Sequence, residues 1–256
     1  IAMIIYGALS DTSIVKLFVA GIIPGIIGGF SMMGLCYWYA IRFNLPKEEA
    51  FSLRRLWVAF KEAGWALMLP VIILGGIFGG FVTATEGAGL AVVAALFIGG
   101  VLYRELNFKH LWSAMIEGVM QTAVVMLLVA TSAVLGLYLT EVQVPQNFAK
   151  WVIGFTNNKY AVLALLNCML FVVGMFLHGA AAIILVVPIV LPLIHQMGID
   201  PIQFGLIMTL NIAVGQQTPP VASVLVTSCS IAKTDIWETT KVNIPFILVL
   251  LSVLML

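Results

Sequence analysis

The sequence predicts an all-α, polytopic integral membrane protein with inverted repeats, helical hairpins and broken transmembrane helices. Its 256 residues are 62% hydrophobic and 9% charged, whereas a soluble domain carries about 25% charged residues. The apolar runs are continuous rather than alternating, which favours spanning helices over a β-barrel. One apolar region, residues 202–232, is interrupted by a polar stretch that contains two consecutive prolines.

Long apolar runs predict the spanning helices, because a helix needs about 20 apolar residues to cross a bilayer. The predicted spans are residues 17–41, 63–82, 87–103, 118–139 and 241–256, and residues 160–177 and 179–197 are two further apolar arms. Residues 140–159 are expected to be polar or re-entrant. By length, the two arms on either side of residue 178 fit either a hairpin with its tip inside the membrane or two full spans with a tip at the surface.

A basic segment, residues 42–62, separates the first two spans. Residues 46–62 are predicted to form an amphipathic helix along the membrane interface. Its apolar positions follow i, i+3, i+4, i+7 spacing: Leu53, Leu56, Trp57 and Phe60. The excess of Lys and Arg places this segment on the cytoplasmic side. It is either a solvated interfacial helix or a brace against a partner subunit or the lipid surface.

Residues 202–214 and 221–232 are each too short to span a bilayer, so together they predict one span with a broken middle. The break reads Gly215-Gln216-Gln217-Thr218-Pro219-Pro220. The prolines lack amide donors, so upstream carbonyl groups lose their helical partners. Such backbone occurs at membrane depth only where it is buried in protein or lines a wet cavity. Secondary transporters build ion and substrate sites from broken helices of this kind.

The chemistry of the break suits a cation beside an anion. Free carbonyl groups and the Thr218 hydroxyl suit an oxygen-seeking cation such as sodium, which we place near Gly215, Thr218 and Pro219. The start of the second half-helix, near Val221, presents free amides and a positive dipole end to an anionic substrate. The alternative is a proline kink needed only for packing, but the polar residues 216–218 at that depth favour a polar role.

Two further candidates lie on the neighbouring segments. The predicted hairpin tip is His178-Gly179-Ala180, in which His178 is either a proton or substrate contact or a capped turn histidine. Asn211 lies one turn before Gly215 and is expected to donate to the site or to orient it. Asn167 lies in an apolar run, where it is equally well explained as a hydrogen-bonding link between helices.

A second polar tip contains Thr83, Thr85 and Glu86. Glu86 is a functional candidate if this tip lies inside the membrane. If the tip reaches the surface, Glu86 is only an acidic residue in the first turn of a helix, stabilised by the helix dipole.

An internal echo predicts a repeat. Residues 1–25 resemble residues 221–246: Thr12-Ser13-Ile14 matches Thr234-Asp235-Ile236, and a proline follows each at a similar distance. Residues 1–41 would then hold the tail of a first repeat and the following transmembrane helix, and residues 63–256 a second repeat. The apolar opening without Met indicates a fragment. Repeats of this sort are the usual plan of secondary transporters.

Several motifs occur in an order that resembles the large membrane subunit of the tripartite ATP-independent periplasmic (TRAP) transporters, the DctM-like family. They are I1-A-M-I-I-Y-G, G80-F-V-T-A-T-E-G-A-G, Y103-R-E-L, H178-G-A-A-A-I-I-L-V-V-P, M197-G-I-D-P and L210-N-I-A-V-G-Q-Q-T-P-P-V. The resemblance implies an elevator-type, sodium-driven importer of organic acid anions. It also implies two partners, a small TRAP membrane subunit and a periplasmic substrate-binding protein, and a hairpin tip at His178 that faces the break. Family substrates include C4-dicarboxylates and sialic acids.

Three positions depart from the family pattern. The family often has an acidic residue in place of His178, Thr-Pro-Thr-Glu in place of residues 83–86, and glycine after the Pro-Pro-Val where this chain has Ala222 and Ser223. These departures leave the fold expectation intact and weaken the transfer of individual substrate contacts. The residues that flank the site, Gln216-Gln217 and Ala222-Ser223, depart from the commoner family pattern and favour sialic acid slightly over a dicarboxylate.

Other classes of function are disfavoured by the sequence. The net charge of +1 argues against a nucleic-acid partner. The chain has no Walker, GxSxG or HExxH motif, so we expect neither an enzyme nor an organic cofactor. The three cysteines sit in apolar runs and show no metal-ligand spacing.

The predicted function is therefore that of a sodium-coupled membrane subunit that imports organic acid anions across the bacterial inner membrane. The alternatives are a channel-type pore, a stand-alone ion-coupled carrier that needs no binding protein, and a scaffold without transport activity. The costly polar break argues against the scaffold.

Overall fold

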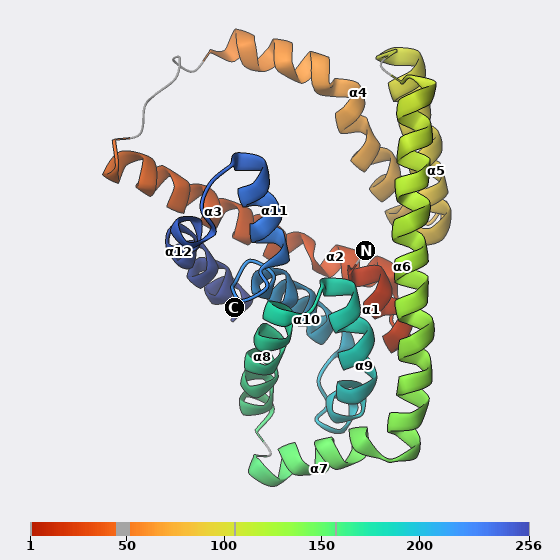
Figure 1. Cartoon of the computed structure of the whole chain (residues 1–256), viewed down its shortest axis with the longest axis vertical. Helices are drawn as coiled ribbons and strands as arrows, with labels where there is room; N and C mark the ends of the chain where they lie inside the picture. The colour runs from red at the N-terminus through yellow and green to blue at the C-terminus, as the bar shows by residue number, and fades with distance from the viewer. Residues whose placement is uncertain (1, 45–51, 105, 157, 256) are drawn as a thin grey trace. The chain divides into compact units, whose positions relative to one another are not determined.

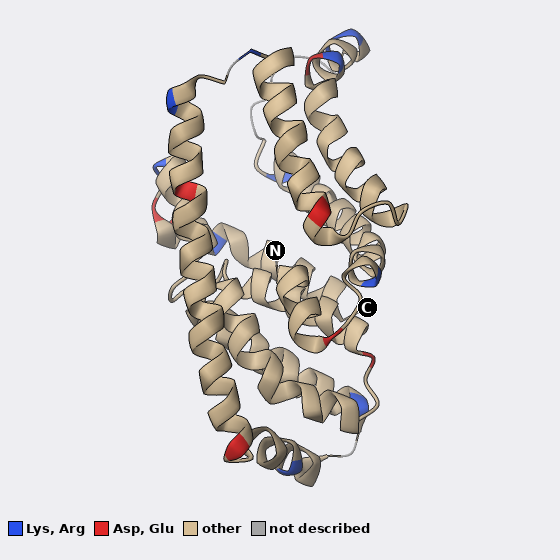
Figure 2. Ribbon diagram, turned by 90° about the vertical axis from the view of Figure 1, so that its right-hand side faces the viewer, with Lys and Arg blue, Asp and Glu red and all other residues tan. Residues whose placement is uncertain are grey.

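The computed structural model describes residues 2–44, 52–104, 106–156 and 158–255, and within these ranges all regular structure is helical (Figure 1). The prediction of an all-α, polytopic protein is confirmed. Seven helical segments of the described chain are long and apolar enough to cross a membrane: Ile14–Arg42, Leu53–Phe78, Ala84–Leu102, Phe108–Glu141, Lys159–Phe176, Gly179–Gln196 and Ile236–Leu254. Figure 2 shows that most of the ribbon carries no charged residue.

The chain divides into two compact units, residues 1–42 with 125–256 and residues 43–124. The helices of the first unit are α1 (Ala2–Ser10), α2 (Ile14–Ala20), α3 (Ile22–Arg42), α7 (Val144–Phe155), α8 (Lys159–Phe176), α9 (Gly179–Gln196), α10 (Pro201–Gly215), α11 (Ser223–Ala232) and α12 (Ile236–Leu254). The second unit contains α4 (Leu53–Phe78), α5 (Ala84–Phe97) and the π-helical η1 (Ile98–Leu102). Helix α6 (Phe108–Glu141) begins in the second unit and ends in the first.

The core of the first unit lies where α10 packs on α8 and where α1 and α7 cover α9. Tyr6 of α1 is fully buried, and its hydroxyl donates a 2.7 Å hydrogen bond to the carbonyl oxygen of Pro201. The ring lies over Gly205, where a Cβ would clash with it. A glycine at this position therefore lets α1 pack directly on the start of α10.

One prediction for the second unit is wrong. Residues 53–78 form a single helix, α4, where the sequence analysis expected an interfacial helix ending at residue 62 and a separate span over 63–82. Both stretches have helical periodicity and nothing between them stops a helix, so they join. Gly79 and Gly80 end α4, the latter in the left-handed region at φ 72°. The start of the expected interfacial helix, residues 46–51, lies outside the described residues.

Three other boundaries differ from the predicted ones. The expected polar or re-entrant segment contains α7, which buries Pro145, Ala149 and Val152 against the core. The first apolar run is divided at Gly21, since Pro24 leaves the Ala20 carbonyl without a helical donor. The last helix begins early at Ile236, because the Asp235 side chain accepts hydrogen bonds from the amides of Trp237 and Glu238.

The two segments of the sequence echo share a local geometry. Helix α1 is followed by Asp11 at φ 54°, and α11 is followed by Lys233 at φ 53°. In each case the next helix begins three residues later, after Ser13 or Asp235 as N-cap. This likeness supports the echo, while the inverted repeat itself stays a prediction.

Candidate ion and substrate site

The predicted break is present between α10 and α11, over residues 216–222. Helix α10 begins after Asp200, whose side chain accepts a 2.8 Å hydrogen bond from the Ile202 amide, and it ends at Gly215. Helix α11 starts after Ala222, which has a left-handed backbone at φ 44°. The broken span is thus two half-helices joined by irregular backbone.

The hydrogen bonds of the break leave carbonyl oxygens available. The amides of Gln217 and Thr218 donate to Val214 and Gly215 over 3.1 and 2.9 Å, and the Thr218 hydroxyl donates to Val214 over 3.3 Å. Among the described residues, no group donates a hydrogen bond to the carbonyl oxygens of Thr218 and Pro219. These oxygens are potential cation ligands.

The hairpin of α8 and α9 contacts this break. A Cβ on Gly179, the first residue of α9, would lie 2.8 Å from Nε2 of Gln216. The amide of Val221 donates to the carbonyl oxygen of Met175, in the last turn of α8, over 3.3 Å. His178 takes the N-cap position of α9 with no hydrogen bond from its side chain to the helix. The tip therefore lies against the break, as the family resemblance implies.

Four helix ends meet at this contact. Helices α8 and α10 end here, and α9 and α11 begin here. Gln216 lies against the start of α9. Its Oε1 accepts a 3.4 Å hydrogen bond from the hydroxyl of Ser223, the first residue of α11. Helix C-termini carry partial negative charge and N-termini partial positive charge. The arrangement therefore offers one set of groups to a cation and another to an anion.

No formal charge belongs to this region of the sequence. Residues 160–199 and 201–232 contain no Lys, Arg, Asp or Glu. Among the described residues, no three or more His, Cys, Asp or Glu side chains gather in a way that suits a metal ion. A cation here would therefore be held by neutral carbonyl and hydroxyl oxygens.

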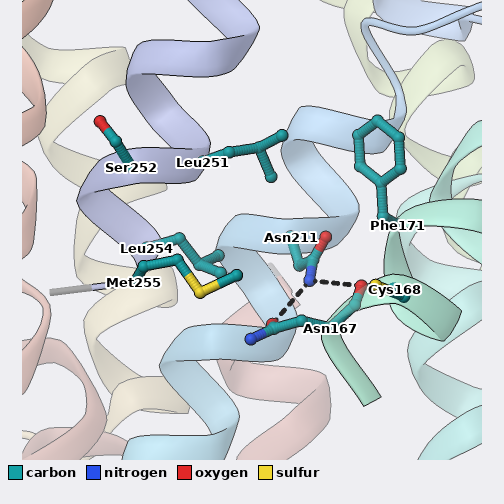
Figure 3. Close-up of a pocket in the computed structure, with 8 residues that line it drawn as sticks. All are labelled: Asn167, Cys168, Phe171, Asn211, Leu251, Ser252, Leu254 and Met255. Carbon is teal, nitrogen blue, oxygen red and sulfur yellow. Dashed lines mark hydrogen bonds between the residues drawn. The ribbon is translucent and has the colours of Figure 1, made fainter. Parts of the chain in front are cut away.

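Asn211 is held by the neighbouring helix and lies one turn away from the break. It is fully buried, and its Nδ2 donates to the backbone oxygen and to Oδ1 of Asn167 over 2.9 and 2.8 Å (Figure 3). Its own Oδ1 has no partner among the described residues. Beside the pair lies a cavity of about 310 Å³, lined otherwise by Cys168, Phe171, Leu251, Ser252, Leu254 and Met255. Asn211 thus donates to α8 rather than to the break.

The second polar tip forms a helix cap. Thr83 is the N-cap of α5, and Oε2 of Glu86 accepts from the Thr83 amide and hydroxyl over 2.7 and 2.9 Å. The Glu86 amide donates back to the Thr83 hydroxyl over 3.3 Å. Thr85 and Glu86 are exposed. This reciprocal capping box accounts for Thr83 and Glu86 as the start of a helix, and the three residues belong to the second unit.

Three residues at or beside the break are not among the site residues that the sequence predicts. Gly174 of α8 touches Gly215 backbone to backbone, Ser223 contacts Gln216, and Nδ2 of Asn243 on α12 lies 3.5 Å from the carbonyl oxygen of Gln217. Asn243 carried a signal, being a polar residue two positions before Pro245 in an apolar helix. Gly174 carried none, because glycines are frequent in membrane helices.

Apolar spans, a helical hairpin and a broken helix whose ends converge define a multi-pass membrane protein with the broken-helix architecture found in secondary transporters. Comparison with known proteins identifies the family. Residues 1–256 match the model described as "Tripartite ATP-independent periplasmic transporter, DctM component". The chain belongs to this family, and is a multi-pass protein of the bacterial inner membrane.

Relatives whose names specify different substrates resemble the chain over almost its whole length. It is 37% identical to the isethionate TRAP transporter permease protein DctMQ of Oleidesulfovibrio alaskensis, over 99% of this chain and 40% of the relative. It is 35% identical to the 2,3-diketo-L-gulonate TRAP transporter large permease protein YiaN of Escherichia coli, over 99% and 60%. It is 34% identical to the sialic acid TRAP transporter permease protein SiaT of Haemophilus influenzae, over 97% and 40%. The chain thus spans 40 to 60% of these relatives' lengths.

Proposed function

We propose that this chain forms part of the large membrane subunit of a sodium-driven importer of organic acid anions. It receives its substrate from a periplasmic binding protein and works beside a small TRAP membrane subunit. The observation that carries the proposal is the contact of the hairpin tip with the break, made through Gly179 with Gln216 and Met175 with Val221. Family membership supports the two partners.

Charge balance explains why an ion and an anion would be carried together. An isolated charge is costly to move into a site without formal charge at membrane depth. Sodium near Gly215, Thr218 and Pro219 would contact carbonyl and hydroxyl oxygens at the C-terminal end of α10. A carboxylate would contact free amides at the starts of α9 and α11. Each charge lowers the cost of burying the other.

The proposed transport cycle follows from that balance. Sodium binds first and organises the irregular backbone of the break. The binding protein then delivers the organic acid anion, and the loaded core moves against a fixed scaffold in an elevator motion. Relatives whose names specify isethionate, 2,3-diketo-L-gulonate and sialic acid support the anion class. Sialic acid and C4-dicarboxylates are the substrates to test first.

The test is uptake by the complete complex in proteoliposomes. Labelled sialic acid, succinate, isethionate and 2,3-diketo-L-gulonate are supplied with or without the binding protein, and with an inward gradient of either sodium or potassium. The proposal expects uptake of at least one anion that requires both the binding protein and sodium. Equal uptake in potassium, or uptake without the binding protein, would point to a channel-type pore or a stand-alone carrier and would refute it.

A further inference from the structure

Gly174 of α8 is the residue that lets the hairpin arm touch the end of α10. It is buried, and a Cβ placed on it would lie 3.1 Å from both Cα and the carbonyl oxygen of Ile212, and 3.2 Å from Cα of Gly215. In the other direction, a Cβ on Gly215 would lie 2.8 Å from Cα of Gly174 and 2.9 Å from the carbonyl oxygen of Phe171. All of these neighbours are backbone atoms, so no side chain is able to move aside.

This approach brings two helix C-termini together. Helix α8 ends two residues after Gly174, and α10 ends at Gly215. Carbonyl groups at both ends carry partial negative charge, so the ends repel each other unless a cation lies between or beside them. A separation larger by a few tenths of an ångström would spread the oxygens that a cation contacts.

Two sets of hydrogen bonds on either side of the glycine contact fix how α8 is aligned along α10 and the break. Two turns before Gly174, the backbone and side-chain oxygens of Asn167 accept hydrogen bonds from Asn211. At the residue directly after Gly174, the carbonyl oxygen of Met175 accepts a hydrogen bond from the amide of Val221, beyond the break. The glycine contact lies between these two bonds, and the three together fix where the hairpin tip meets the break.

We propose that Gly174 is a positioning residue of the cation site: its missing side chain holds α8 and α10 at the separation at which the break binds sodium. The inference rests on the proposed function for the identity of the cation. The positioning of the tip against the break is tested separately from transport.

The first experiment measures position. In the complete complex, with Cys36, Cys168 and Cys229 replaced by alanine, cysteines are introduced as Met175→Cys and Val221→Cys, and disulfide formation is timed under a mild oxidant. Gly174→Ala is expected to slow this reaction several-fold. Gly34→Ala, where a new Cβ meets no atom of the described residues within 4 Å, is the matched control and is expected to leave the rate unchanged.

The second experiment measures function. Gly174→Ala, with native cysteines, is expected to raise the sodium concentration for half-maximal uptake about tenfold, the scale expected for sub-ångström misplacement of ligands, with the apparent affinity for the binding protein unchanged. A lower maximal rate with unaltered half-saturation would mean a purely structural role and would overturn the proposal, as would an unchanged cross-linking rate.

A milder variant keeps the test decisive if Gly174→Ala does not fold. Asn167→Ala removes the side-chain part of the register contact without a clash, and it is expected to change both measurements in the same direction by a smaller factor. No change in either would overturn the proposal. If the wild-type complex shows no sodium dependence, the proposed function fails, and the cross-linking result still decides whether Gly174 positions the tip.

Discussion

The amide of Val221 donates a 3.3 Å hydrogen bond to the carbonyl oxygen of Met175, so the first residue after the double proline is tied to the last turn of the hairpin arm α8. The two residues are 46 positions apart in the sequence. The bond uses an amide that the break frees from regular helix. It makes the hairpin tip and the break one structural unit.

Thr218 is expected to contribute its hydroxyl to sodium binding. Thr218→Val keeps the shape of the side chain and removes that oxygen, so the half-saturating sodium concentration in uptake assays should rise about tenfold, the scale of one lost hydrogen bond or ligand to a charged group. Thr218→Ser keeps the hydroxyl, so its half-saturating sodium concentration should stay close to that of the wild type. Thr131→Val on α6, where the hydroxyl donates to carbonyl oxygens of its own helix, is the control. An unchanged sodium requirement in Thr218→Val would remove this residue from the site.

The Asn167–Asn211 pair is expected to stabilise the seam between α8 and α10. Asn211→Leu leaves two oxygens of Asn167 without their donor and should lower the free energy of unfolding by about 1–3 kcal/mol. Asn167→Leu together with Asn211→Leu should cost less than the sum of the two single changes, because the partners are removed together. Thermal unfolding of the detergent-solubilised complex measures this. Additive losses would show that the hydrogen bonds do not couple the two residues.

The polar tip at Thr83 is expected to act as a cap and not as an ion site. Thr83→Ala should destabilise the start of α5 by about 1 kcal/mol, while Thr83→Ser should have little effect. Neither change should alter the sodium dependence of uptake. A shift in sodium half-saturation in Glu86→Gln, with folding intact, would restore Glu86 as a functional intramembrane acid.

Gly205 is expected to be intolerant of any side chain. A Cβ on this residue would clash with the Tyr6 ring and lie 2.9 Å from Leu17, so Gly205→Ala should lower stability by about 1–3 kcal/mol, as overpacking of a core does. Both obstacles are side-chain atoms, so Tyr6→Leu in the same chain should recover part of the loss. In Gly154→Ala the new Cβ meets no atom within 4 Å in the part of the chain that the structure describes, and this variant serves as the comparison. Full stability of Gly205→Ala would contradict the packing of α1 on α10.

The sequence predicted the parts of the fold that depend on membrane thickness. The arms on either side of His178 and the two half-helices on either side of the break were placed to within a few residues, because apolar length is directly limited by the bilayer. Where two helical stretches meet without a stop signal, as within α4, the sequence does not show whether they form one helix or two. Gly79 and Gly80 ended that helix earlier than hydropathy alone indicated.

The composition of the candidate site was predicted better than its geometry. Gln216 and Thr218 stood out because polar groups are costly at that depth. Asn211 was named as a donor, and its partner Asn167 was seen as a link between helices, but their pairing is a tertiary contact with no local signal. Gly174 was missed for the same reason: a glycine shows its role only when the backbone that it contacts is known.

Amide hydrogen exchange of the complete complex in detergent, compared in sodium chloride and in potassium chloride, would show whether sodium binds at the break. We expect sodium to slow exchange at the amides of residues 216–218, 221–224 and 177–181, and Thr218→Val to weaken this protection. Protection that is the same in both salts, or that appears only away from the break and the hairpin tip, would contradict the assignment of the cation site.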